Sequence, residues 1–254
     1  QNFGNTSYYF IHQLTYGVGL GLLAMYIFSR IDYHIWKKLI PVALIGTLIA
    51  LALVKVPGIG FGANGATRWI DLGPLFFQPA EAAKLAIIFY LAGWMSEKDH
   101  TQGFAKSVFP PIAIIGLYCG LILWQPDLGT MISICLTAAI MLFVGGIRLR
   151  YFAWLTAAGV VVMLGLIRLE PYRVRRITAF LNRSIDPLGI GYQINQALIG
   201  IGSGGWFGYG YGQSRQKHSY LPEAINDSIF AVMAEELGFI RVILILLLFL
   251  WFIV

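Results

Sequence analysis

Four carboxylates lie close together in the segment 220–238, where the polar sequence YLPEAINDS runs into the apolar sequence IFAVMAEELG. Glu223 and Asp227 belong to the polar part, whereas Glu235 and Glu236 belong to the apolar part. Removing a carboxylate from water is costly, so a carboxylate beside hydrocarbon is usually paired, coordinates an ion or moves a proton. This pattern predicts chemistry at a membrane boundary, with Asp227 as the first candidate for the working group.

The composition indicates that these carboxylates belong to a membrane protein. Hydrophobic residues make up 58% of the 254 residues, charged residues only 12%, and the mean hydropathy is +0.72. A soluble domain carries about twice that share of charge. We therefore expect an all-α polytopic membrane protein, because a helix satisfies its own backbone hydrogen bonds inside a bilayer. About seven apolar segments approach the roughly 17–25 residues of a transmembrane helix: 10–29, 40–56, 78–95, 108–124, 128–146, 152–168 and 226–251.

The organisation of the chain follows from the order of these segments. No internal repeat and no low-complexity linker divides residues 1–254, which predicts a single integral-membrane domain. The chain starts at Gln1 and stops inside an apolar run at Val254, which favours a fragment of a longer chain. No secretory signal peptide is recognisable before the first apolar segment, so the membrane spans themselves should direct insertion.

Basic residues in the short loops predict the orientation. Three short loops on one side of the membrane carry Lys and Arg, which favours the cytoplasmic face. These residues are Arg30, Lys37, Lys38, Lys98, Lys106, Arg148 and Arg150. The long polar segment of about 168–225 then lies outside the cytoplasm, where long loops escape the positive-inside rule. Part of the net charge of +6 lies in this loop, which indicates a membrane or lipid-linked phosphate as partner and argues against nucleic acid.

Two features of the long loop suggest how it meets the membrane. Residues 190–200 have the mixed apolar and amide pattern of an amphipathic helix lying in the interface. The run GSGGWFGYGYG at 202–212 is rich in glycine, so its backbone could approach an anionic group closely and present N–H groups to it. This signal is weak by itself, and it lacks the spacing of a nucleotide-binding P-loop.

Other polar residues favour structural roles. Glu81 and Lys84 lie at i, i+3 in an otherwise apolar helix, which predicts a buried, structural ion pair. Asp127 in WQPDLGT should cap the following helix, although an outward ligand contact is the alternative. Cys119 and Cys135 fall within adjacent apolar helices, and we assign them no function. The four histidines are scattered, so no zinc site is proposed.

Several long motifs together resemble one family. They are NGATRWIDLGPLFFQPAEAAKLA at 64–86, WQPDLGT at 124–130, DPLGIGYQINQALIGIGSGGWFG at 186–208 and GQSRQKHSYLPEAINDSIFAVMAEELGFI at 212–240. On these motifs the chain is similar to the SEDS peptidoglycan glycosyltransferases of the FtsW, RodA and SpoVE type, and more to the cell-division FtsW branch. The chain departs from the family's usual residues at a few positions, among them Ile225, Ser228 and Arg241. Arg241 is notable because it lies inside an apolar helix, where a charged side chain needs a partner.

The resemblance implies a fold, a location and partners. Members have about ten transmembrane helices, so this chain would lack the first and the last two. They are multi-pass proteins of the bacterial inner (plasma) membrane that serve cell division, cell shape or sporulation. Their implied substrate is lipid II, the undecaprenyl-pyrophosphate-linked disaccharide peptide. Their implied protein partners are a class B penicillin-binding protein transpeptidase and other division or elongation proteins.

The resemblance also implies an enzymatic reaction and roles for residues. One lipid II would give its glycan to the 4-hydroxyl of a second, with release of undecaprenyl pyrophosphate. Asp227 matches the family's essential aspartate and would act as general base. Arg68, Arg215 and Lys217 would balance the pyrophosphate charge, and Glu223 would orient the acceptor or a metal ion. No cofactor is certain, and whether a divalent cation takes part is left open.

Three alternatives stay open at this point. Asn226 and Asp227 directly precede Ser228, so Asp227 could instead be the N-cap of the last helix. Intramembrane carboxylates in a multi-span bundle would equally suit a lipid-linked precursor flippase or transporter, although no repeat of the kind found in carriers is visible. A non-catalytic scaffold of the division machinery is the third alternative.

Overall fold

The computed structural model of the chain describes residues 8–63, 66–71, 73, 76–97, 108–181, 191–218, 220–222, 224 and 227–254. Its contacts group the chain into two compact units, Gln1–Ala158 and Gly159–Val254, with the division inside one long helix. Each unit is described by itself below. The single-domain organisation of residues 1–254 stays a prediction.

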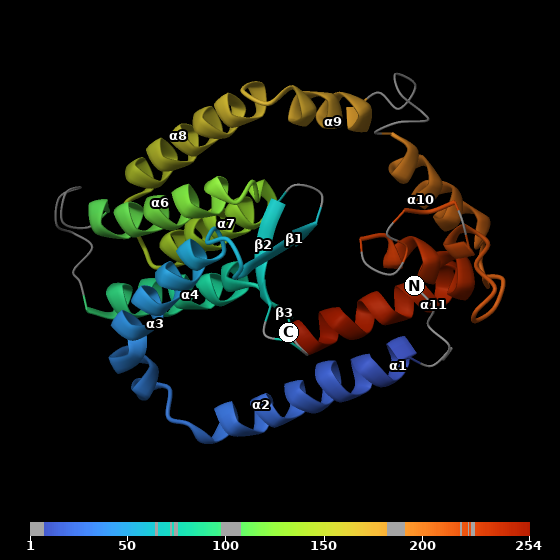
Figure 1. Ribbon diagram of the computed structural model, residues 1–254, viewed down its shortest axis with the longest axis horizontal. Helices are drawn as coiled ribbons and strands as arrows, with labels where there is room; N and C mark the ends of the chain where they lie inside the picture. The colour runs from blue at the N-terminus through green and yellow to red at the C-terminus, as the bar shows by residue number, and fades with distance from the viewer. Residues whose placement is uncertain are drawn as a thin grey trace. The chain divides into compact units, whose positions relative to one another are not determined.

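The first unit is built mainly from helices (Figure 1). A helical run starts with α1 (Tyr8–His12), passes through a π-helical segment (Gln13–Gly19) and continues as α2 (Leu20–Arg30). The other helices are α3 (His34–Leu53), α4 (Pro79–Glu97), α6 (Phe109–Trp124), α7 (Leu128–Val144) and α8 (Leu149–Arg168), the last of which continues into the second unit.

Helices α3, α4, α6 and α7 pack together around the core of this unit. Helix α4 buries the small residues Ala80, Ala83 and Ala86 at a spacing of three, which lets neighbouring helices approach closely. The buried amide of Gln125 donates to the carbonyl oxygen of Leu51 at 2.8 Å, so a polar group between helices is hydrogen-bonded. Close packing and the hydrogen bond between Gln125 and Leu51 therefore help to hold this helical unit together.

A small antiparallel sheet lies between α3 and α4 in the sequence, and the all-α prediction did not contain it. Strands β1 (Gly60–Ala63), β2 (Ala66–Asp71) and β3 (Phe76–Phe77) form it in that order. Phe61 pairs with Trp69, and Ile70 with Phe77. Aromatic and β-branched residues suit strands, which agrees with the short strands in this loop.

The membrane character of the chain agrees with the helices. Four helical segments are long and apolar enough to cross a bilayer, namely Phe10–Arg30, His34–Leu53, Leu149–Arg168 and Ile229–Ile253. Helices α6 and α7 are apolar but shorter, and α4 has Glu81 and Lys84 in its first turns. The polytopic helical fold is confirmed, whereas the count of seven spans and their orientation stay predictions.

The second unit contains the helices that follow α8. They are α9 (Pro171–Leu181), α10 (Tyr192–Ser203), a single 3₁₀ turn (Gln216–His218) and α11 (Ile229–Ile253). Helix α10 covers much of the predicted amphipathic segment and packs against the start of α11, with Ala197 against the buried cluster of Leu221, Ala231 and Val232. The long predicted loop is therefore largely structured where the chain is described.

Candidate functional site

Helix α11 is broken at Gly238, whose backbone has φ 76° and ψ 172°. A positive φ of this kind is readily adopted only by glycine. Around the break, four hydrogen bonds join the helix to the loop that follows α10. They are Tyr209 N–H to Glu235 O (3.0 Å), Gly210 N–H to Glu236 O (3.0 Å), Phe239 N–H to Gly205 O (2.9 Å) and Ile240 N–H to Trp206 O (3.2 Å). The loop thus satisfies backbone groups that a continuous helix would pair internally.

Glycines allow the loop to come this close to the helix. A Cβ atom on Gly204 would lie 2.1 Å from the carbonyl oxygen of Ala234, and one on Gly208 would lie 2.2 Å from that of Glu236. A Cβ on Gly238 would in turn meet the backbone nitrogen of Gly208 at 2.3 Å. The glycine-rich run was predicted to approach an anionic group, and here it approaches the broken helix, because only backbone without side chains fits.

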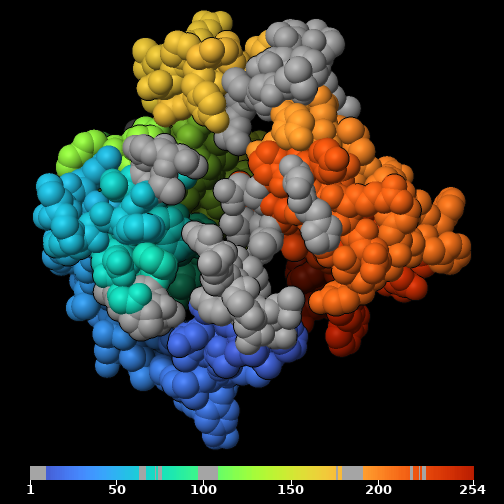
Figure 2. Space-filling view, turned by 45° about the vertical axis from the view of Figure 1, so that its right-hand side comes forward, coloured from blue at the N-terminus to red at the C-terminus, as the bar shows by residue number. Residues whose placement is uncertain are grey.

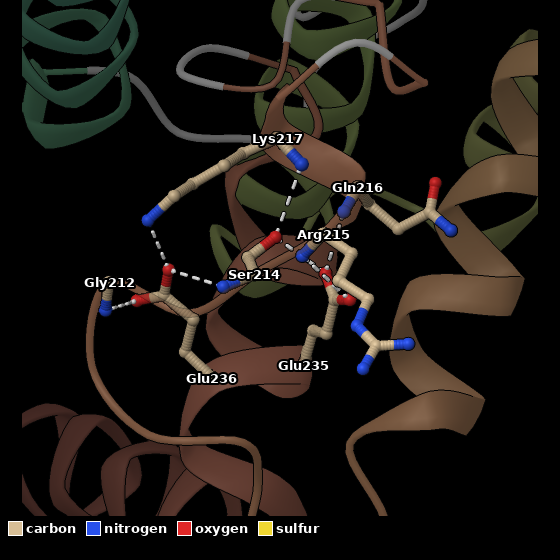
Figure 3. Close-up of polar contacts among 7 residues, drawn as sticks. All are labelled: Gly212, Ser214, Arg215, Gln216, Lys217, Glu235 and Glu236. Carbon is tan, nitrogen blue, oxygen red and sulfur yellow. Dashed lines mark hydrogen bonds and ion pairs between the residues drawn. The ribbon is translucent and has the colours of Figure 1, made fainter.

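The side chains of Glu235 and Glu236 form hydrogen bonds with the next part of the loop, residues 212–217 (Figure 3). Only 1% of Glu235 and 7% of Glu236 is exposed. Glu235 accepts hydrogen bonds from Ser214 Oγ and from the backbone N–H groups of Arg215 (3.1 Å) and Gln216 (3.3 Å). We call this arrangement of both glutamates and residues 212–217 the carboxylate nest.

Glu236 completes the nest from the neighbouring position. Its carboxylate accepts from the backbone N–H groups of Gly212 (2.9 Å) and Ser214 (3.2 Å) and from Lys217 Nζ (2.6 Å). Buried charges persist when they are paired and fully hydrogen-bonded. These contacts give Glu235 and Glu236 a structural role in holding the loop.

Asp227 lies just before α11 and is exposed. The N-cap residue of α11 is Ser228, and no side chain caps this helix end. Ser228 is held elsewhere, since its hydroxyl donates to Pro222 O at 3.2 Å and accepts from Gln193 Nε2 at 3.2 Å. Among the described residues, Asp227 forms no hydrogen bond or ion pair. The N-cap alternative for Asp227 is therefore not what the structure shows, and its carboxylate is available to a ligand.

The basic residues predicted to bind substrate differ in their surroundings. Lys217 is held by Glu236 within the nest. Arg215 is exposed, and its guanidinium lies 5.4 Å from the centre of the Tyr209 ring. Arg68 belongs to the first unit, where it donates to Pro126 O at 2.5 Å. Among the described residues, the guanidinium of Arg215 forms neither an ion pair nor a hydrogen bond, unlike the charged groups of Lys217 and Arg68. All three substrate-binding assignments stay predictions.

Two further predictions about site residues have different outcomes. Glu223 lies outside the described residues. Lys84 Nζ and Glu81 Oε2 form the predicted pair at 2.7 Å, but the side chains are 30% and 57% exposed, so the pair is not buried as expected. A partly exposed pair contributes little to stability, and removing one partner costs less than in a buried pair because water can solvate the charge that remains.

Local predictions outside the site also have outcomes. Asp127 caps α7 as predicted, accepting from Thr130 N–H at 3.2 Å and from Thr130 Oγ1 at 2.8 Å. The Cys119 and Cys135 sulfur atoms lie 3.5 Å apart as free thiols. Helices α6 and α7 thus place the two cysteines side by side, and the cysteines carry no assigned function.

Sequence reasoning missed two residues that organise this region. Ser214 connects the nest, because its hydroxyl donates to Glu235 and accepts from Lys217 N–H at 3.2 Å. Gln193 reaches from α10 to Ser228, next to Asp227. Both residues lie in motifs that resemble the family, and this resemblance was the only signal in the sequence that could have pointed to them. Their partners are many residues away in the chain, so spacing alone could not identify them.

Together, these features define a multi-pass helical membrane protein in which an exposed aspartate precedes a broken helix that a carboxylate nest stabilises. The chain belongs to the cell cycle protein family of FtsW, RodA and SpoVE, whose family model matches residues 1–254.

Relatives in this family are similar over most of the chain. The "Probable peptidoglycan glycosyltransferase FtsW" of Shewanella sediminis is 42% identical over 244 residues, which cover 96% of this chain and 59% of that protein. "Stage V sporulation protein E" of Bacillus subtilis is also 42% identical over 244 residues, covering 96% of this chain and 67% of that protein. The chain thus spans about three fifths to two thirds of the length of these relatives.

Solved structures show the same fold. One, described as "Structural coordination of polymerization and crosslinking by a peptidoglycan synthase complex", matches with a TM-score of 0.70 and 26% identity over 92% of this chain and 65% of that chain. The crystal structure of the rod shape determining protein RodA of Thermus thermophilus matches with a TM-score of 0.60 and 28% identity over 92% of this chain and 60% of that chain.

Proposed function

We propose that this protein is a peptidoglycan glycosyltransferase that polymerises lipid II. The glycan of one lipid II is transferred to the sugar 4-hydroxyl of a second, and undecaprenyl pyrophosphate leaves. The observation that carries this proposal is Asp227, exposed and without a partner among the described residues, at the N-terminal end of α11. The name of the similar FtsW protein, which includes peptidoglycan glycosyltransferase, supports the reaction class.

In the proposed reaction, Asp227 takes the proton of the acceptor hydroxyl as its oxygen attacks the anomeric carbon of the donor. The bond from that carbon to the pyrophosphate oxygen breaks, and the electron pair leaves with the pyrophosphate. A general base of this kind typically contributes about 10²–10⁴-fold to the rate. The base must be free to accept a proton, and the exposed Asp227 meets this requirement, whereas Glu235 and Glu236 are occupied by donors.

Basic side chains would balance the charge of the leaving pyrophosphate. Arg215 is the best placed of the predicted residues in the second unit, because its charge is outside an ion pair and its backbone N–H is fixed by Glu235. The carboxylate nest would then act as a positioning device for Arg215. Lys217 and Arg68 are weaker candidates, since each already has a partner in this chain.

The location and partners belong to the same proposal. We place the protein in the bacterial plasma membrane with Asp227 on the extracytoplasmic side, as the basic short loops predict. A class B penicillin-binding protein is the proposed partner, in line with the similar structure whose description joins polymerisation and crosslinking.

The test is polymerisation of labelled lipid II by the purified protein together with its transpeptidase partner, with products resolved by gel electrophoresis. We expect Asp227→Asn to lower the rate by at least about 100-fold, because the amide has nearly the same shape but cannot take the proton. The matched control is Asp32→Asn, an exposed aspartate in the loop before α3. Unchanged polymer formation by Asp227→Asn would refute the assigned role.

The same preparations separate the alternatives. Transport of labelled lipid II across vesicle membranes without polymer would indicate a flippase or transporter. Neither polymer nor transport, with retained binding of the transpeptidase, would indicate a scaffold.

A further inference from the structure

An apolar pocket opens beside the break in α11. It has a volume of about 370 Å³ and is lined by Ile201, Gly202, Gly205, Trp206 and Phe239. The rings of Trp206 and Phe239 meet edge to face, with centroids 5.5 Å apart. No group that the proposed reaction uses lines this pocket, so the reaction leaves the pocket unexplained.

Exposed aromatic side chains line the pocket or lie near its lining residues in the sequence. Trp206 is 65% exposed, and the others are Phe207, Tyr209, Tyr211 and Phe239. They belong to the stretch of chain whose orange surface is seen in Figure 2. Aromatic residues gather where a bilayer meets water, because their rings suit the headgroup region. Their concentration here favours a membrane boundary near the break in α11, deeper in the candidate span Ile229–Ile253 than its first residue.

Arg241 lies three residues after the break and is exposed. Its Nη1 donates to the carbonyl oxygen of Phe207 at 3.3 Å, which gives this arginine the partner that an apolar helix requires. It has no acidic partner among the described residues. From Val242 to Val254 the sequence contains no charged residue, so Arg241 stands where the charged part of α11 gives way to its uninterrupted apolar part.

We infer that the pocket binds one anionic phospholipid of the surrounding bilayer, with its phosphate at Arg241 and part of an acyl chain in the pocket. A guanidinium has five N–H donors and pairs well with phosphate, and only one bond is committed to Phe207. The apolar walls suit a hydrocarbon chain. Positive charge at an otherwise apolar, aromatic surface favours an anionic lipid over a zwitterionic one. This inference does not depend on the proposed reaction.

Native mass spectrometry of the delipidated full-length protein in detergent tests the charge contact. We expect phosphatidylglycerol to bind more tightly than phosphatidylcholine with the same chains. Arg241→Gln should weaken phosphatidylglycerol binding about tenfold, as expected for loss of a charged hydrogen bond. Arg241→Lys should weaken it less. The matched control is Arg150→Gln, at the start of α8, which removes an exposed arginine elsewhere.

A second variant tests the chain pocket without changing charge. A Cβ on Gly202 would meet nothing within 4 Å, so Gly202→Leu should fill the pocket without disturbing the backbone. We expect it to lower phosphatidylglycerol affinity several-fold. Gly116→Leu is the control, because Gly116 lies in α6 with equally open space around it.

The outcomes decide the inference. Equal binding of the two lipids, or wild-type affinity in both Arg241→Gln and Gly202→Leu, would overturn it. Displacement of the lipid by millimolar inorganic phosphate would show an anion site without a chain pocket and would also overturn it. If Arg241→Gln does not fold, as judged by its melting temperature, the Arg241→Lys and Gly202→Leu variants decide. None of these readouts requires polymerase activity, so failure here is distinct from failure of the proposed function.

Discussion

Replacing Glu235 by glutamine should release the loop of the carboxylate nest. Glutamine keeps the shape of glutamate but retains only one acceptor oxygen. Oε2 of Glu235 accepts from Ser214 Oγ and Gln216 N–H, whereas Oε1 accepts only from Arg215 N–H. The amide will therefore place its oxygen where it keeps two bonds, and its NH₂ group will face the N–H of Arg215.

The magnitude follows from the bond that is lost. A hydrogen bond to a charged group contributes about 1.5–3 kcal/mol, and a donor left without a partner adds to the cost. If the free energy of local opening falls by this amount, the amide hydrogens should exchange about 10- to 100-fold faster. Hydrogen exchange measured by mass spectrometry on peptides covering 212–218 should show this acceleration in Glu235→Gln.

Controls separate local release from general unfolding. Glu81→Gln alters a partly exposed pair in the first unit and should leave exchange in 212–218 unchanged. Exchange in α6 should be unchanged in both variants. If the loop of Glu235→Gln exchanged at the wild-type rate, the carboxylate would not be what holds it, and the account of the nest would be wrong.

Two further substitutions test the backbone geometry. Gly208→Ala should lower the free energy of unfolding by about 2 kcal/mol or more, because its Cβ would lie 2.2 Å from Glu236 O and its φ is +75°. Thermal melting measures this loss. The control is Gly116→Ala, which should melt near the wild-type temperature. Asp127→Ala should cost about 1 kcal/mol by loss of the α7 cap, and an unchanged melting temperature would mean that the bonds to Thr130 contribute nothing.

The contacts that the sequence predicted well are local. Asp127 and Thr130, like Glu81 and Lys84, are three residues apart in one helix or at its start. Helical geometry alone brings such positions together. Exposure was harder to predict, since it depends on which helix face meets a neighbour. The Glu81–Lys84 pair therefore formed as predicted but lies less buried than expected.

The carboxylate nest could not be predicted because it joins distant residues across an irregular backbone. The positive φ of Gly238 interrupts an apolar sequence that reads as one continuous helix. Gly204 and Gly208 lie four residues apart, a spacing typical of close backbone packing, but this signal does not identify the partner. The glycine-rich run was predicted to present N–H groups to an anionic group, and Gly212 N–H does donate to a carboxylate, that of Glu236 in the same chain.

Helix boundaries and short strands differ from the predictions for a related reason. Hydropathy locates the stretch of chain that suits lipid, and helices continue beyond that stretch. Helix α3 begins at His34, although its apolar segment was predicted from residue 40. Helix α9 is amphipathic and was not predicted as a separate element. Strands β1 to β3 are too short to give a clear alternating pattern.

The structure places the carboxylates of Asp227, Glu235 and Glu236 in different surroundings. Glu235 and Glu236 each accept three hydrogen bonds from the loop they hold. Taking up a proton would weaken these bonds, because a protonated carboxyl group accepts fewer of them and loses its charge. Asp227 can take up a proton without breaking any contact among the described residues. In the described part of the chain, the hydrogen bonds of the nest therefore fix Glu235 and Glu236, whereas Asp227 keeps its place as the proposed base.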